Sequence, residues 1–191
     1  MSSLIYDGCY TSWSIDFMDI INPFHLISSE KKYENPWISV REDRVIRPGG
    51  KEWIFGVVTV KNGSLILPVD VEYNVFLNYE YHYALWKYEY KLFGGQIDDN
   101  EDSLIAAKRE LSEESGIVAE KWSFLGIVHP YTNIVYGVEQ IYLAEWLTFL
   151  DAHPEEWETT KLQKFTFKEA LQLVYDGRIT HWASVVWILR A

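Results

Sequence analysis

The chain has 191 residues and a formal charge of −11 at pH 7, because 28 Asp and Glu outnumber 17 Lys and Arg. This acidity argues against a general nucleic-acid binder, which must neutralise phosphates with basic side chains. The length is typical of one domain, or of a compact domain with a small appendage. An aromatic content of 16% argues against disorder.

Cysteine content and hydropathy restrict the class of protein further. The chain has a single cysteine, Cys9, so an internal disulfide and a cysteine-based zinc site are both excluded. No basic residue precedes Lys31, and no apolar run approaches the length of about 18 residues that spans a membrane. We therefore expect a soluble, cytoplasmic protein that does not bind membranes.

The first predicted elements are strands. Residues 37–47 and 53–60 are rich in β-branched and aromatic side chains, and Pro48-Gly49-Gly50 between them is typical of a turn. A further strand is expected over residues 64–69. Because Asn-Gly is a favoured two-residue turn, Asn62-Gly63 predicts a hairpin between the strands before and after it.

Alternating tyrosines mark the next strand, residues 75–83. Tyr79, Tyr81 and Tyr83 fall on one face, and two more tyrosines, at positions 88 and 90, follow a short turn. We favour packing against a core or a partner subunit as the role of this face, since aromatic pairs stabilise sheets. A stacking surface for a ligand ring is the alternative.

One helix, two strands and two further helices are predicted in the rest of the chain. A helix is predicted over about residues 102–115, with Asp99, Asn100 or Ser103 as its cap and Gly116 closing it. Two strands are predicted next, followed by a helix that opens on a capping box and a last helix. Their positions are 122–128, 139–146, Thr166 to Gly177, and the residues after Thr180.

Three glutamates on the first helix carry the strongest chemical signal. Glu110, Glu113 and Glu114 are three and four residues apart, which puts their carboxylates on one helical face, where like charges repel. A divalent cation removes that repulsion, and hard oxygen ligands suit Mg²⁺ or Mn²⁺. Arg109 can pair with Glu113 or with Glu101. A solvated acidic face is the alternative.

The whole segment resembles the box of the Nudix hydrolases. That box is Gly, five residues, Glu, seven residues, Arg-Glu-aliphatic, any residue, Glu-Glu, any residue, Gly-aliphatic. Every position matches here: Gly95, Glu101, Arg109-Glu110-Leu111, Glu113-Glu114 and Gly116-Ile117.

The resemblance implies an α+β fold, namely an αβα sandwich with a mixed central sheet, plus a small N-terminal antiparallel sheet. It implies N-terminal strands over residues 1–60, for base binding and dimerisation, and a hydrolase domain over residues 61–191. Carried over by position, the metal ligands are Glu110, Glu113, Glu114 and the Gly94 carbonyl. Glu113, Glu114 and Arg109 are catalytic, and Gly95 and Glu101 lie behind the metal ligands and help to orient them.

Residues 35–60 look like the first strands of the ADP-ribose pyrophosphatase branch, whose dimers exchange such strands. By this resemblance Trp37, Trp53 and Arg47 contact the substrate, the tryptophans sandwiching its base. Hydrophobic packing or a dimer contact is the alternative for both tryptophans. Glu156, with Glu155 and Glu158 beside it, lies where this branch carries an acidic loop and is our choice as general base, the alternative being a solvated loop.

Two departures from that branch bear on the substrate. On the strand before the box, that branch usually has Gln-Tyr-Arg, where this chain has Glu80-Tyr81-His82. Leading into the box, it has Glu-Leu-Pro-Ala-Gly, where this chain has the segment from Lys91 to Gly95. His82 thus takes the place of a substrate-contacting arginine, the alternative being a structural histidine. Metal binding and hydrolysis should be retained despite these departures. They leave undetermined which group is linked to the nucleoside diphosphate of the substrate.

The resemblance implies a homodimeric, Mg²⁺-dependent pyrophosphohydrolase, with Mn²⁺ as a second possible metal. Its substrate would be a nucleoside diphosphate derivative, ADP-ribose or another nucleotide sugar, and its products a nucleoside monophosphate and a sugar phosphate. Two alternatives are a Nudix-fold module that senses a nucleotide metabolite without turnover, and an enzyme for nucleoside triphosphates or dinucleoside polyphosphates.

Overall fold

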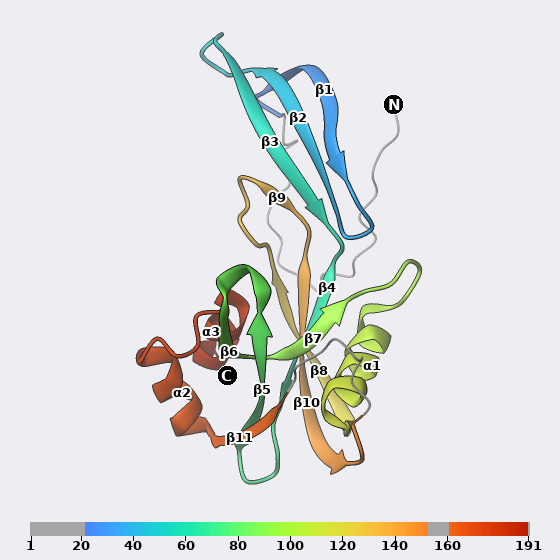
Figure 1. The fold of residues 1–191 in the computed structure, drawn as a ribbon, viewed down its shortest axis with the longest axis vertical. Helices are drawn as coiled ribbons and strands as arrows, with labels where there is room; N and C mark the ends of the chain where they lie inside the picture. The colour runs from blue at the N-terminus through green and yellow to red at the C-terminus, as the bar shows by residue number, and fades with distance from the viewer. Residues whose placement is uncertain (1–21, 153–160, 191) are drawn as a thin grey trace, which may run out of the picture.

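The computed structural model describes residues 22–152 and 161–190. Its first three strands form an antiparallel sheet that projects from the rest of the molecule (Figure 1). These strands are β1 (His25–Glu34), β2 (Ile38–Ile46) and β3 (Glu52–Val60), and the short β9 (Val135–Tyr136) pairs in parallel with β3. The small N-terminal sheet is therefore present, and β9 ties it to the main body.

A mixed four-stranded sheet lies at the centre of the main body. Its order is β7 (Phe93–Gln96), β4 (Gly63–Pro68), β10 (Glu139–Phe149) and β8 (Ile117–Val128), with β4 and β10 parallel and the other pairs antiparallel. A second sheet in this body contains β11 (Leu162–Thr166), β5 (Asn74–His82) and β6 (Lys87–Lys91). A single 3-10 turn, η1 (Tyr83–Leu85), connects β5 to β6.

Helices cover the central sheet on both sides. The helix α1 (Ser103–Ser115) lies on one side, and α2 (Phe167–Tyr175) and α3 (Trp182–Arg190) lie on the other (Figure 1). Two buried clusters result. One packs Phe93, Leu111 and Tyr142 under α1, and the other packs Leu67 and Trp187 with α3. The predicted αβα sandwich with a mixed sheet is confirmed.

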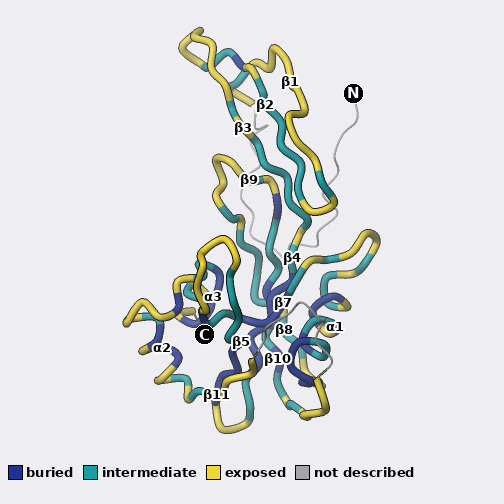
Figure 2. The backbone as a smooth tube through the Cα atoms, viewed as in Figure 1, coloured by how far each residue is buried: buried dark blue, intermediate teal, exposed yellow. Residues whose placement is uncertain are grey.

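Burial is concentrated where the helices meet the central sheet. Figure 2 shows the buried segments gathered there, whereas the β1–β3 sheet is exposed or half-buried along most of its length. None of the helices in the described residues is long and apolar enough to cross a membrane.

The predicted hairpin around Asn62-Gly63 is wrong. The two strands belong to different sheets: β3 pairs with β2 and β9, whereas β4 pairs with β7 and β10. The Asn62 carbonyl accepts from the Ile97 N–H, and its side chain accepts from the Val138 N–H at 3.1 Å. These distant partners hold the segment extended, so that the chain crosses from one sheet to the next without reversing.

The helix cap also differs from the prediction. Asp102 is the N-cap, and its carboxylate accepts from the N–H groups of Leu104 and Ile105. Asn100 instead adopts a left-handed conformation with φ of 66°. The predicted closure at Gly116 is confirmed, since that residue ends α1 with φ of 69°. The capping box between Thr166 and Glu169 at the start of α2 is likewise present.

Candidate active site

The site is built where α1 packs across strand β7. Gly95 lies so close to this helix that a Cβ at its position would be only 2.6 Å from Glu110 Oε1. A side chain at residue 95 would therefore displace the Glu110 carboxylate. The glycine is needed here for close approach between strand and helix.

Arg109 organises the acidic residues on the exposed side of α1. Its Nε and Nη2 each donate to Glu101 at 3.0 Å, and its Nη1 donates to Glu110 at 2.8 Å and Glu113 at 3.2 Å. Nη2 also donates to the Gln96 carbonyl. These contacts engage all five N–H donors of a guanidinium. Hydrogen bonding from Arg109, with help from the Asp98 N–H, lowers the pKa of Glu101 to about 2.

Glu114 lies on the buried side of the same helix. Its carboxylate accepts a hydrogen bond from the Gly94 N–H at 3.0 Å, and only 6% of the residue is exposed. Burial raises the pKa of Glu114 to about 8, against the opposing effects of Lys91 and the Gly94 N–H. The fold therefore holds a carboxyl group where its charged form is poorly solvated.

The glutamates are close together but do not converge. Among residues 22–152 and 161–190, no three His, Cys, Asp or Glu side chains are arranged around one point as metal ligands. Arg109 draws Glu110 and Glu113 to one side, and the Gly94 N–H holds Glu114 on the other. The oxygen donors nonetheless fit a hard cation, whose charge would offset the repulsion among them.

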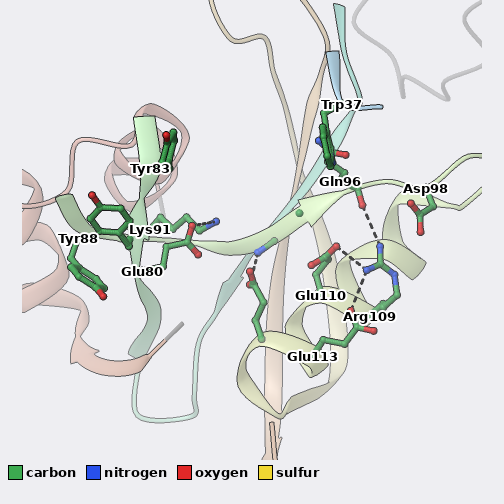
Figure 3. A pocket seen from close by; sticks show the side chains of 14 residues that line it. Trp37, Glu80, Tyr83, Tyr88, Lys91, Gln96, Asp98, Arg109, Glu110 and Glu113 are labelled. Atoms are coloured by element: carbon green, nitrogen blue, oxygen red, sulfur yellow. Dashed lines mark hydrogen bonds and ion pairs between the residues drawn. The ribbon is translucent and has the colours of Figure 1, made fainter. Parts of the chain in front are cut away.

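A cavity of about 880 Å³ lies above these glutamates. Figure 3 shows Arg109, Glu110 and Glu113 along one side, Tyr83 and Tyr88 on the opposite side, and Trp37 at the end nearest the N-terminal sheet. The full lining is Trp37, Glu80, Tyr81, Tyr83, Tyr88, Lys91, Gly94, Gly95, Gln96, Asp98, Arg109, Glu110, Glu113 and Glu114.

The tyrosine face divides between core and cavity. Tyr90 packs edge-on against Phe165 with ring centroids 5.2 Å apart, and Tyr79 lies against Tyr90 at 4.7 Å. The tyrosines at positions 81, 83 and 88 instead line the cavity. Packing within the molecule is therefore confirmed for Tyr79 and Tyr90, whereas stacking of the cavity tyrosines on a ligand ring stays a prediction.

Sequence reasoning missed the ion pair on the tyrosine side of the cavity. Lys91 Nζ lies 3.0 Å from Glu80 Oε1, and both side chains are largely buried. Burial alone would lower the pKa of Lys91, but the neighbouring Glu114 and Glu80 outweigh burial and raise it. Both residues depart from the family pattern, but their contact depends on the pairing of β5 with β6, which no local pattern reveals.

Glu139 was not anticipated either. It lines a second cavity of about 270 Å³ that shares Lys91, Gly94, Gly95 and Gln96 with the larger one. Burial raises the pKa of Glu139 to about 7, and its Oε2 has no hydrogen-bond partner among the described residues. It is the first residue of β10, and nothing in the sequence around it signals that its carboxyl group is buried.

Three predicted substrate contacts do not reach the larger cavity within one chain. The Arg47 guanidinium lies 4.6 Å from the Trp53 ring, at the end of β3 opposite the cavity. His82 does not line the cavity, and its buried Nε2 has no hydrogen-bond partner in the described part of the chain. Glu156 and its neighbours Glu155 and Glu158 lie outside the described residues.

Two family models match the chain. The model described as the nucleoside diphosphate sugar hydrolase N-terminal domain matches residues 24–58, which cover β1, β2 and most of β3. The NUDIX domain model matches residues 54–185, which include the whole site apart from Trp37.

Characterised relatives are similar over most of their length. The chain is 28% identical over 170 residues to an ADP-ribose pyrophosphatase of Mycobacterium tuberculosis, covering 87% of this chain and 82% of that protein. It is 25% identical over 159 residues to a CMP-5'-(N-acetyl-N-hydroxy-3-aminopropyl)phosphonate hydrolase of Streptomyces rubellomurinus, covering 82% and 76%. A crystal structure of an ADP compounds hydrolase has the same fold, with a TM-score of 0.77, 20% identity and coverage of 89% and 94%.

Proposed function

Since the chain belongs to the Nudix family of pyrophosphohydrolases, we propose that it hydrolyses the diphosphate bond of a nucleoside diphosphate linked to a second group, X. The products are a nucleoside monophosphate and phosphorylated X. The observation that carries the proposal is the acidic wall of the large cavity, where Arg109 orders Glu110 and Glu113 and the Gly94 N–H holds Glu114.

The site requires a divalent cation, for which we propose Mg²⁺, with Mn²⁺ as a substitute. Glu110, Glu113, Glu114 and the Gly94 carbonyl would hold it, because they are hard oxygen donors beside a strand that Gly95 keeps free of side-chain bulk. A bound divalent cation neutralises diphosphate charge and lowers the pKa of a water molecule.

The chain's own residues supply orientation and binding. Arg109 and Glu101 fix the outer glutamates, and Trp37 stacks on the nucleobase at the end of the cavity nearest the N-terminal sheet. Glu156 accepts the proton of the attacking water. The other predicted substrate contacts, Trp53, Arg47 and His82, require a second chain or a rearrangement, because none of them lines the cavity of one chain.

The X group is an ADP-ribose-like sugar phosphate or a different phosphorylated group. The relatives support this breadth, since one is named for ADP-ribose and another for a CMP-linked phosphonate. The cavity supports it as well, because the lining contributed by β5, η1 and β6 is largely aromatic rather than specific for one sugar. In this proposal residues 61–191 form the hydrolase domain, and residues 1–60 form the base-binding and dimerisation region.

Dimerisation is part of the proposal. The β1–β3 sheet leaves large apolar side chains exposed, among them Leu26, Tyr33, Trp53 and Ile54. Exposed apolar surface of this kind is typical of protein interfaces. A homodimer in solution is the expected state, and sedimentation equilibrium tests it; a monomer at micromolar concentration would contradict this part.

A substrate panel tests the function. With Mg²⁺ or Mn²⁺, purified protein should convert at least one nucleoside diphosphate derivative to two monophosphates identified by mass spectrometry, and EDTA should abolish turnover. Incorporation of ¹⁸O from labelled water identifies the attacked phosphorus. Activity that persists in EDTA contradicts the proposal, and tight binding without turnover across the panel would favour a sensor.

Gly95→Ala tests the contact between strand and helix. The added methyl group would lie 2.6 Å from Glu110 Oε1, so the carboxylate must move. Displacing a positioned group by about 1 Å can cost about a hundredfold in rate, and we expect a fall in kcat of that order. Gly56→Ala is the matched control for a methyl group added to a strand, because apart from its chain neighbours no atom lies within 4 Å of a Cβ built there; since Gly56 lies in the proposed dimerisation region, both variants are compared as dimers. Equal kcat for the two variants would refute the prediction.

A further inference from the structure

Lys91 is the last residue of β6, and its side chain lies where the two cavities meet. Residue 91 lines both the larger cavity and the smaller one that contains Glu139. Only 15% of its side chain is exposed. Figure 3 shows Lys91 and Glu80 extending from the tyrosine side of the cavity toward the side formed by α1.

The charges around the larger cavity are mostly negative. Its lining contains two basic residues, Lys91 and Arg109, against five acidic ones: Glu80, Asp98, Glu110, Glu113 and Glu114. An anionic diphosphate needs positive charge on more than one side, because a cation held by the glutamates faces it from α1 alone. The basic residues of the lining are the protein groups able to supply that charge.

Arg109 is not available for this purpose. All five of its N–H donors are engaged by Glu101, Glu110, Glu113 and the Gln96 carbonyl. Lys91 is different. An ammonium group has three donors, and within residues 22–152 and 161–190 its single ion pair is with Glu80, at 3.0 Å.

We propose that Lys91 is a phosphate-binding residue, whose ammonium binds a non-bridging oxygen of the substrate's diphosphate from the side opposite α1 while Glu80 fixes its position. This inference rests on the proposed function and adds a substrate contact to it. Glu80 is the positioning residue of the pair, because its carboxylate orients the ammonium without touching the substrate. If Lys91 only neutralised the nearby glutamates, its removal would not specifically weaken the binding of a phosphate ligand.

The test measures binding of methylenediphosphonate, a diphosphate analogue that cannot be hydrolysed and carries no base or sugar. In Mg²⁺, calorimetry should show that Lys91→Met weakens its binding by about ten- to a hundredfold, the equivalent of one charge-assisted hydrogen bond. Lys91→Arg, which keeps the charge, should retain most of the affinity. Lys121→Met is the matched control, since Lys121 pairs with Glu145 at 2.6 Å and lines neither cavity.

A second titration separates phosphate binding from metal binding. Without the analogue, Mn²⁺ should bind Lys91→Met as tightly as wild type or more tightly, because a positive charge near the glutamates has been removed. Unchanged analogue affinity in Lys91→Met, an equal loss in Lys121→Met, or weakened Mn²⁺ binding in Lys91→Met would each overturn the proposal. So would a wild-type protein that does not bind the analogue.

Separate controls distinguish a folding defect, a failure of the proposed function and a failure of the Lys91 proposal. If Lys91→Met is unstable because Glu80 is left buried without its partner, the double variant Glu80→Gln/Lys91→Met removes that charge and carries the test. Failure of the proposed function would appear as absence of turnover across the substrate panel. Failure of the Lys91 proposal would instead appear only in the affinities for methylenediphosphonate and Mn²⁺, while the wild-type protein still turned over its substrate.

Discussion

Glu114→Gln should lower kcat on the order of a thousandfold, because the charge stabilisation from a metal ion is worth several kcal/mol and each ~1.4 kcal/mol is a factor of ten. The amide keeps the shape of the side chain, and its oxygen can still accept the hydrogen bond that the Gly94 N–H donates to Glu114 Oε2 at 3.0 Å. What it loses is the negative charge required of a metal ligand. Steady-state rates at saturating Mg²⁺ measure the effect.

The same substitution should not harm the fold. Burial raises the pKa of Glu114 to about 8, so this group's contribution to the free energy of unfolding is lost as pH rises from about 4.5 through about 8. Without metal, Glu114→Gln should therefore unfold at a temperature equal to or above that of wild type at pH 8, and the difference should shrink at pH 5. Glu120→Gln, an exposed glutamate on β8, is the control. Full activity in Glu114→Gln would exclude the assigned role.

Arg109→Met should lower kcat by about ten- to a hundredfold, the usual effect of removing a group that orients metal ligands. Arg109 holds Glu101, Glu110 and Glu113 at 2.8 to 3.2 Å. Without it the three carboxylates repel one another and lose their common orientation. Arg109→Lys should recover only part of the rate, because a point charge cannot donate in the forked geometry of a guanidinium.

Salt dependence and a matched variant distinguish the loss of this orienting role from a general loss of stability. Because the loss includes repulsion among partly exposed carboxylates, the thermal stability of Arg109→Met should rise with ionic strength more than that of wild type. Arg178→Met is the control, since Arg178 is exposed and stacks on Tyr90 away from the glutamates. A kcat for Arg109→Met equal to that of Arg178→Met would contradict the orienting role.

Local patterns predicted the chemistry of this protein because the acidic segment is continuous. From Asp98 to Glu114 there are seven acidic and two basic residues, and the helical period alone places three glutamates within about one turn of each other on α1. The helix, its closing glycine and the capping box at Thr166 also depend on hydrogen bonds between near neighbours. The cap itself was misplaced by a few residues, since several adjacent side chains could form it.

Long-range pairing decided the rest. Asn62-Gly63 has the chemistry of a tight turn, yet contacts with Ile97 and Val138 keep it extended between two sheets. No local pattern carries information about partners so distant in the chain.

The sequence by itself determined the acidic helix and the family-level chemistry, because these depend on residues within a few helical turns. Only the tertiary structure decided what faces that helix. It brings Trp37 to the cavity and leaves Trp53 at the far end of β3, and it pairs Lys91 with Glu80 across from the glutamates. The physical reason is that strand register and sheet packing join distant segments, whereas helical periodicity and capping join neighbours.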